Sequence, residues 1–249
     1  MSSFKIRTDL ALEARENMDD AAEECRGVSV EEEYDQKSEI RITRVVIETK
    51  NGAKAMGKPI GTYITLEAPA MALPDEDYHQ EIAGELARQL RRIIPGLEGE
   101  QSVMVVGLGN RDVTADALGP NVVDNLIITR HMVKEYGKAA YNQNRIHMIS
   151  GLIPGVMAKT GMESQEIIKG VVEQTKPDVV VVIDALAARS TKRLNRTIQV
   201  TNTGIHPGSG VGNNRNAITK EALGVPVIAI GVPTVVDAAT IVNDALERM

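Results

Sequence analysis

Three short runs of valine and isoleucine constrain the fold of this chain more than any other feature. They cover residues 103–106, 179–183 and 225–230. Runs that are apolar at every position are typical of strands covered on both faces, as in a parallel sheet. Segments with helical periodicity separate the runs, and this alternation indicates an α/β fold with right-handed crossovers. We therefore expect a single mainly parallel sheet with helices on both faces.

An additional pair of strands is expected before the first run. Residues 40–47 and 60–67 are rich in β-branched and aromatic side chains, which favour sheet. Asn51-Gly52 between them is a turn signal. We expect these segments to form an N-terminal antiparallel strand pair.

Helical periodicity defines the connecting elements. Apolar residues recur every three or four positions over residues 82–94, with Asp75 or Asp77 as a candidate N-cap. Three further helices are expected. One covers residues 120–133, one begins after a capping box formed by Thr160 and Glu163, and one covers residues 233–246.

Composition excludes several classes of function. The 249 residues carry a formal charge of −6, which argues against binding nucleic acid through its phosphates. Aromatic residues make up only 2%, too few for a base-stacking surface. The one cysteine, Cys25, rules out an internal disulfide and a cysteine-cluster zinc site. No apolar run is long enough for a signal peptide or a membrane span, so we expect a cytoplasmic location.

The first 39 residues differ from the rest of the chain. They are polar and irregular, with acidic side chains gathered between Glu23 and Glu39. We expect residues 10–39 to form a flexible, solvated acidic arm. Residues 40–249 are expected to form the α/β domain.

Sites in α/β sheets form beyond the carboxyl ends of the strands. Segments 107–120, 184–189 and 203–215 are expected to meet there. Gly107-Leu108-Gly109-Asn110 is not a dinucleotide fingerprint, because Asp112 stands where the third glycine belongs. The glycine-rich loop over residues 204–215 has Asn213 where a phosphate-binding loop needs lysine.

Two aspartates are the strongest candidates for chemistry at this edge. Asp184 follows five apolar residues, and Asp116 lies in the loop after the first run. Either could instead cap a helix, Asp184 at a helix beginning at Ala185. Two carboxylates about 5 Å apart repel by about 3 kcal/mol at an effective dielectric near 20, so such a pair shares one proton. A pair of this kind can deprotonate a water with one carboxylate and protonate a peptide with the other.

A metal centre is an alternative use of the same residues. His206 is the one histidine expected near the site, and it could bind a metal together with Asp116 and Asp184. No His-Glu-x-x-His motif is present. In the third alternative the chain is a non-enzymatic α/β binding protein whose aspartates only cap helices.

Several long segments resemble the germination protease family, spore endopeptidases that degrade small acid-soluble spore proteins. The resemblance covers essentially the whole chain. It is most specific in the segments around Asp116, Asp184 and His206 and in residues 224–238, which read GVPVIAIGVPTVVDA.

The resemblance implies an atypical aspartic endopeptidase whose catalytic aspartates match Asp116 and Asp184. Its fold is similar to that of the hydrogenase-maturation endopeptidases, a metal-linked family that supplies the alternative above. No cofactor or metal is implied for this chain. Asn110 and His206 are expected to help position the peptide.

The resemblance also implies a self-processing zymogen. Arg7-Thr8-Asp9-Leu10-Ala11-Leu12-Glu13 is similar to the family's cleavage motif, so cleavage is expected between Asp9 and Leu10 and favoured by acidic pH. Residues 1–9 would be the propeptide. The implied substrates are small acid-soluble DNA-coating proteins cut during germination in the spore core, and the implied assembly is a homotetramer without direct nucleic-acid or membrane contacts.

Overall fold

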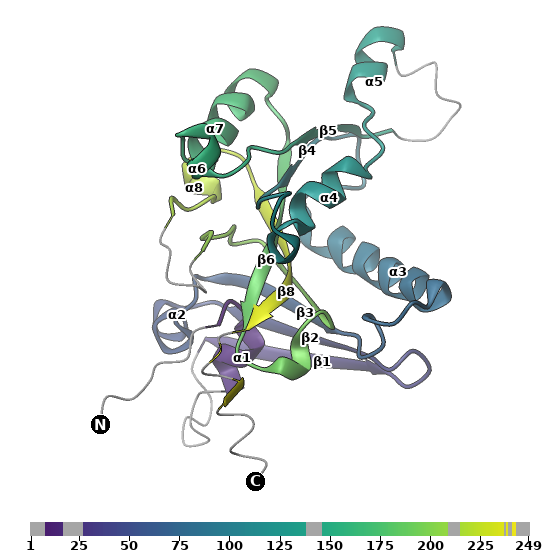
Figure 1. Cartoon of the computed structure of the whole chain (residues 1–249), viewed down its shortest axis with the longest axis vertical. Helices are drawn as coiled ribbons and strands as arrows, with labels where there is room; N and C mark the ends of the chain where they lie inside the picture. Colours follow the sequence, from purple (N-terminus) through teal and green to yellow (C-terminus); the bar gives the residue numbers. More distant parts are fainter. Residues whose placement is uncertain are drawn as a thin grey trace.

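The computed structural model describes residues 8–16, 27–137, 146–208, 215–236, 238, 241 and 242. Its centre is one eight-stranded sheet in the order β1-β2-β3-β7-β8-β6-β4-β5 (Figure 1). The strands are β1 (Val28–Asp35), β2 (Ile40–Ile47), β3 (Gly61–Glu67), β4 (Ser102–Gly107), β5 (Met148–Leu152), β6 (Val179–Ala188), β7 (Thr197–Thr201) and β8 (Val227–Val236).

The sheet is mixed, so the expectation of a mainly parallel sheet is wrong. The neighbours β5, β4, β6 and β8 run parallel, whereas β8, β7, β3, β2 and β1 pair antiparallel. The three predicted buried runs are the parallel strands β4, β6 and β8. The antiparallel pair β2–β3 is also confirmed. Strand β7, which joins the two halves, was missed because it is only five residues long. Its polar side chains, those of Thr197, Gln199 and Thr201, are buried like the apolar ones between them.

Helices cover both faces of the parallel half, as predicted. The helices and turns are α1 (Ala11–Glu16), α2 (Lys50–Met56), α3 (Glu76–Ile93), η1 (Thr114–Asp116), α4 (Leu118–Asp124), α5 (Arg130–Tyr136), α6 (Met157–Thr160), α7 (Ser164–Thr175), η3 (Thr191–Arg193) and α8 (Lys220–Leu223). On one face α3 and α4 enclose the larger core cluster, which includes Ile82, Ile93 and Val105. On the other face α7 and α8 pack Ile168 and Leu223 against the sheet (Figure 1).

Several predicted element boundaries shift. Asp75 caps α3 by accepting the Tyr78 N–H at 3.0 Å, as expected. The Asn51-Gly52 signal lies inside α2 instead of a turn, and the helix predicted over residues 120–133 is broken into α4 and α5. The capping box at α7 pairs Glu163 with Glu166, one turn later than predicted.

Two strands continue past the points where we expected helices to begin. Strand β6 extends to Ala188, so Asp184 lies inside a strand and is not the N-cap of a helix. Strand β8 extends through Pro233 to Val236, so the last predicted helix does not begin at Pro233. Most of the rest of that helix lies outside the described residues.

Part of the expected acidic arm is ordered structure. Within residues 10–39 the structure shows α1 and β1, and β1 pairs with β2 along its whole length. Most residues of β1 are exposed, so its acidic side chains are solvated as expected. The prediction of an irregular segment, however, is wrong for residues 28–35. Polar residues on both faces of β1 left no alternation by which to recognise it. Residues 1–7 of the expected propeptide and residues 17–26 lie outside the described part.

Within the described residues, no helix has both the length and the apolar character needed to cross a membrane.

Candidate active site

The loop after β4 folds back closely on itself to place Asp116. Gly109 has a φ of 112°, and a Cβ there would lie 2.0 Å from the main-chain oxygen of Asp116. A Cβ on Gly119 would lie 2.3 Å from the Leu108 oxygen and 2.5 Å from the Ile183 oxygen. These glycines are therefore required by close main-chain packing against β6, which accounts for the glycine pattern without a nucleotide.

A bulge in β8 anchors the same loop. Pairing of β6 with β8 shifts register after Leu186, which faces Pro233, so that Ala187 faces Val235. The extra residue, Thr234, donates its hydroxyl to the Ala115 oxygen at 2.6 Å. Proline lacks the N–H needed to continue a ladder, and bulges of this kind redirect a side chain. Here the redirected side chain holds the residue directly before Asp116.

Asp184 lies in the middle of the sheet, where β6 is paired with Gly231 of β8. It is 7% exposed, and its Oδ1 accepts the N–H of Ala185 at 2.9 Å. Burial, together with the charges of Asp116 and Asp9, raises the pKa of the Asp184 carboxyl to about 8, and the Ala185 N–H opposes this shift. Desolvation penalises the charged form of a buried carboxyl, so Asp184 is protonated at neutral pH.

Asp116 is more accessible than Asp184. Burial raises the pKa of its carboxyl above the ordinary value, and the Asn110 N–H opposes this shift. The pKa of Asp184 is raised in part by the Asp116 charge. The two carboxyls therefore interact electrostatically, and their titrations are coupled.

Both carboxyls line one cavity of about 300 Å³. His206 and Asp9 also line it, together with residues from β7 and β8. The structure thus brings together four of the residues singled out from the sequence. Asn110 is not among the lining residues: its N–H donates to the Asp116 main-chain oxygen at 3.0 Å, and its Oδ1 accepts the Asp112 N–H. No three His, Cys, Asp or Glu side chains gather as a metal site in the part of the chain that the structure describes.

The expected cleavage site is docked in this cavity. The Asp9 N–H donates to the Ala187 oxygen at 3.1 Å, and the Ala187 N–H donates to the Asp9 carboxylate at 3.0 Å. Leu10 is fully buried against Leu186 and Ala188. Pairing of β6 with β4 ends at Ile183, so these later residues of β6 bind the N-terminal segment instead.

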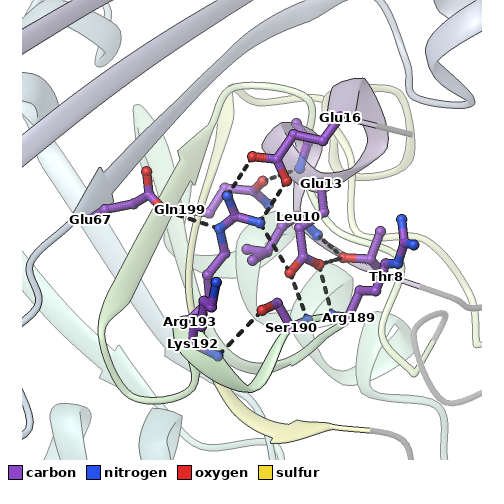
Figure 2. A network of polar contacts seen from close by, with 11 residues as sticks. Thr8, Leu10, Glu13, Glu16, Glu67, Arg189, Ser190, Lys192, Arg193 and Gln199 are labelled. Carbon is purple, nitrogen blue, oxygen red and sulfur yellow. Dashed lines mark hydrogen bonds and ion pairs between the residues drawn. The ribbon is translucent and has the colours of Figure 1, made fainter. Parts of the chain in front are cut away.

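A polar network around Glu13 holds α1 in place (Figure 2). Glu13 is 1% exposed, and its carboxylate accepts the N–H groups of Arg189 at 2.7 Å and Ser190 at 2.9 Å. The Thr8 hydroxyl also donates to it. Arg193 reaches Glu13 at 3.4 Å and forms a bidentate ion pair with Glu16. Sequence reasoning missed this network because its members lie about 180 residues apart.

The chain matches known proteins along nearly its whole length. The family model described as Germination protease matches residues 6–249. The Germination protease of Caldanaerobacter subterraneus subsp. tengcongensis is 54% identical over 98% of this chain and 73% of its own length. Those of Clostridium perfringens and Bacillus mycoides are 48% and 43% identical, over 74% and 67% of their lengths. On this evidence the chain belongs to the germination protease family of peptidases.

Proposed function

We propose that this chain is an aspartic-type endopeptidase that uses Asp116 and Asp184 to hydrolyse peptide bonds, its own Asp9–Leu10 bond first. The observation that carries the proposal is a single cavity lined by both carboxyls and by Asp9. General acid catalysis needs a protonated carboxyl, which the buried one can supply, and general base catalysis needs an ionised carboxyl, which the more accessible one can supply.

The difference in environment between the two carboxyls supports a division of roles. Asp116, as the carboxylate, accepts a proton from a water whose oxygen bonds to the Asp9 carbonyl carbon. Asp184, protonated at the start, donates its proton to the Leu10 nitrogen as the carbon–nitrogen bond breaks. The products are a free carboxyl on Asp9 and an amine on Leu10. Transfer of the proton from Asp116 to Asp184 restores the starting state.

The docked N-terminal segment supports a zymogen that processes itself. Asp9 is hydrogen-bonded to Ala187 of β6 through both its N–H and its carboxylate, and the next side chain, Leu10, is buried. A peptide already held in the cavity needs no second molecule to be cut. We propose that residues 1–9 leave in this step, and that the cavity then becomes available to substrates in trans.

Finer aspects of the function follow the family resemblance. We propose that the substrates are small acid-soluble DNA-coating spore proteins and that the enzyme acts in the spore core during germination. A homotetramer is proposed as the assembly. Strand β1 ends the sheet with an exposed edge, the kind of surface through which copies of a chain pair. Light scattering of the purified full chain measures this assembly directly.

The dyad is tested by neutralising each carboxyl. Full chains carrying Asp116→Asn or Asp184→Asn are held at mildly acidic pH, and loss of residues 1–9 is followed by mass spectrometry. We expect each variant to process at least about 1000-fold more slowly, because residues that act as a catalytic unit lose most of the rate together.

Asp112→Asn is the matched control. Asp112 lies in the same loop, but its exposed side chain pairs with Lys159 outside the cavity. This control is expected to process at the wild-type rate. Full processing in Asp116→Asn or Asp184→Asn would rule out the proposed dyad.

A further inference from the structure

The carbonyl oxygen of Asp9 accepts hydrogen bonds from two side chains. Lys58 Nζ lies 2.9 Å from this oxygen, and Gln199 Nε2 lies 3.2 Å from it. Lys58 Nζ is also 3.4 Å from the Thr8 oxygen. Gln199 Oε1 accepts the Ala11 N–H at 2.6 Å, so one amide side chain spans the peptide bond that follows Asp9.

Both donors are positioned by elements outside the N-terminal segment. Gln199 lies at the centre of β7, is 7% exposed and pairs with Gly231 of β8. Lys58 follows Gly57, whose φ of 61° ends α2, and its N–H donates to the Ala53 oxygen at 3.2 Å. The backbone positions of both donors are therefore set by α2 and β7, whereas their side-chain termini bond the N-terminal segment itself.

Both donors also line the cavity that contains the two carboxyls. Burial in this cavity lowers the pKa of Lys58, whereas the nearby carboxylates of Asp9 and Glu13 favour its charged form. In poorly hydrated surroundings, a cation and an amide N–H that both point at one oxygen stabilise negative charge on that oxygen more strongly than they would in water.

We propose that Lys58 and Gln199 bind the oxyanion that forms on the scissile carbonyl, a catalytic role that rests on the function proposed above. As the water oxygen bonds to the Asp9 carbonyl carbon, the π electron pair of the carbonyl moves onto its oxygen. The ammonium of Lys58 and the amide of Gln199 stabilise that negative charge. The proton of Asp184 is therefore kept for the Leu10 nitrogen, where the carbon–nitrogen bond breaks. The same pair would receive the carbonyl of any peptide cut in trans.

The first measurement is the rate of Asp9–Leu10 cleavage in full-length variants. Lys58→Met and Gln199→Met each remove one donor at similar side-chain length. Loss of one oxyanion donor typically lowers the rate about 100- to 1000-fold, and we expect losses in this range. Lys58→Arg restores a cationic donor and should recover part of the rate. Lys54→Met, at an exposed lysine of α2, is the matched control and should process normally.

A second measurement separates catalysis from anchoring of the peptide. Each substitution is combined with Asp184→Asn, so that the segment stays uncut, and hydrogen exchange of residues 10, 12 and 13 is recorded. Ala11 is left out because its own N–H donates to Gln199 Oε1. Contacts of Asp9 with Ala187 and of Glu13 with Arg189 and Ser190 do not involve the altered side chains. We expect these residues to stay protected in the variants.

Two outcomes would overturn the inference. One is processing within threefold of the wild-type rate in both methionine variants while Asp116→Asn is inactive. The other is a loss of protection as large as the loss of rate, which would make Lys58 and Gln199 anchors only. Failure of the dyad itself is a separate result, because it appears as normal processing in Asp116→Asn or Asp184→Asn.

Discussion

Thr234 connects a local irregularity of β8 to the placement of Asp116. Its hydroxyl bonds the Ala115 oxygen, and it is free to do so because the bulge removes it from register with β6. The hydrogen bond crosses from one strand to a loop 119 residues earlier in the chain. At the scale of single residues, the site therefore depends on the Thr234 hydroxyl, which fixes the loop before Asp116, as well as on the two carboxyls.

Replacing this residue tests how far the loop anchor matters. Thr234→Val keeps the side-chain shape but leaves the Ala115 oxygen without its donor, a loss of about 1–2 kcal/mol. We expect Asp9–Leu10 processing to slow about tenfold while the chain remains folded by circular dichroism. Thr234→Ser should restore the rate. Equal rates in the valine variant and the wild type would show that the anchor is dispensable.

At the scale of elements, α1 is a short helix held both by buried apolar residues and by the polar contacts of Glu13 and Glu16. A six-residue helix is unstable alone, so its position depends on Leu10, Ala11 and the Glu13 carboxylate. Arg193, on the η3 turn after β6, faces three carboxylates, those of Glu13, Glu16 and Glu67. This arginine therefore links the N-terminal segment to both halves of the sheet (Figure 2).

Removing that link should release α1. Arg193→Met removes the arginine that pairs with the buried Glu13, which keeps its main-chain partners and the charge of Lys58. The loss should therefore lie below about 3–5 kcal/mol, the cost typical of breaking a buried pair. We expect faster hydrogen exchange over residues 8–16 and slower self-processing, with little change in the sheet strands. Lys192→Met, at the neighbouring exposed position, is the control. Unchanged exchange in Arg193→Met would contradict this role.

At the scale of the whole molecule, Asp184 links stability to pH. Its pKa is about 8 in the folded chain and near 3.8 when the chain unfolds. Between these values the folded state binds a proton that the unfolded state does not, so stability falls as pH rises, by up to about 1.4 kcal/mol per pH unit. The destabilisation is complete above pH 8 and absent below the unfolded pKa.

This linkage gives a measurable difference between two proteins. From pH 5 to pH 8 the wild type should lose up to about 4 kcal/mol of unfolding free energy relative to Asp184→Asn. Denaturant titrations at several pH values measure it, and the subtraction removes contributions from groups that do not interact with Asp184. Parallel stability curves would mean that Asp184 is charged in the folded state. The same pKa predicts that self-processing declines as pH rises through about 8.

Much of the parallel half of the fold could be read from the sequence. The apolar runs at β4, β6 and β8, the periodicity of α3 and the strand pair β2–β3 are local patterns, and each is confirmed. Strands β1, β5 and β7 give weaker local signals, since β1 is mostly polar, β5 contains Ser150 and Gly151, and the alternation in β7 covers only five residues. The mixed sheet was missed for this reason.

The candidate site divides in the same way. The sequence by itself determined that Asp116 and Asp184 come after apolar runs, and the family resemblance placed the expected cleavage after Asp9. Tertiary structure alone decided that Asp184 lies within a strand, that Asp9 shares its cavity, and that Lys58 and Gln199 meet at one carbonyl oxygen. Periodicity records only whether a residue faces the core or solvent. Which atoms meet across 50 or 190 residues of chain is settled by strand order and register.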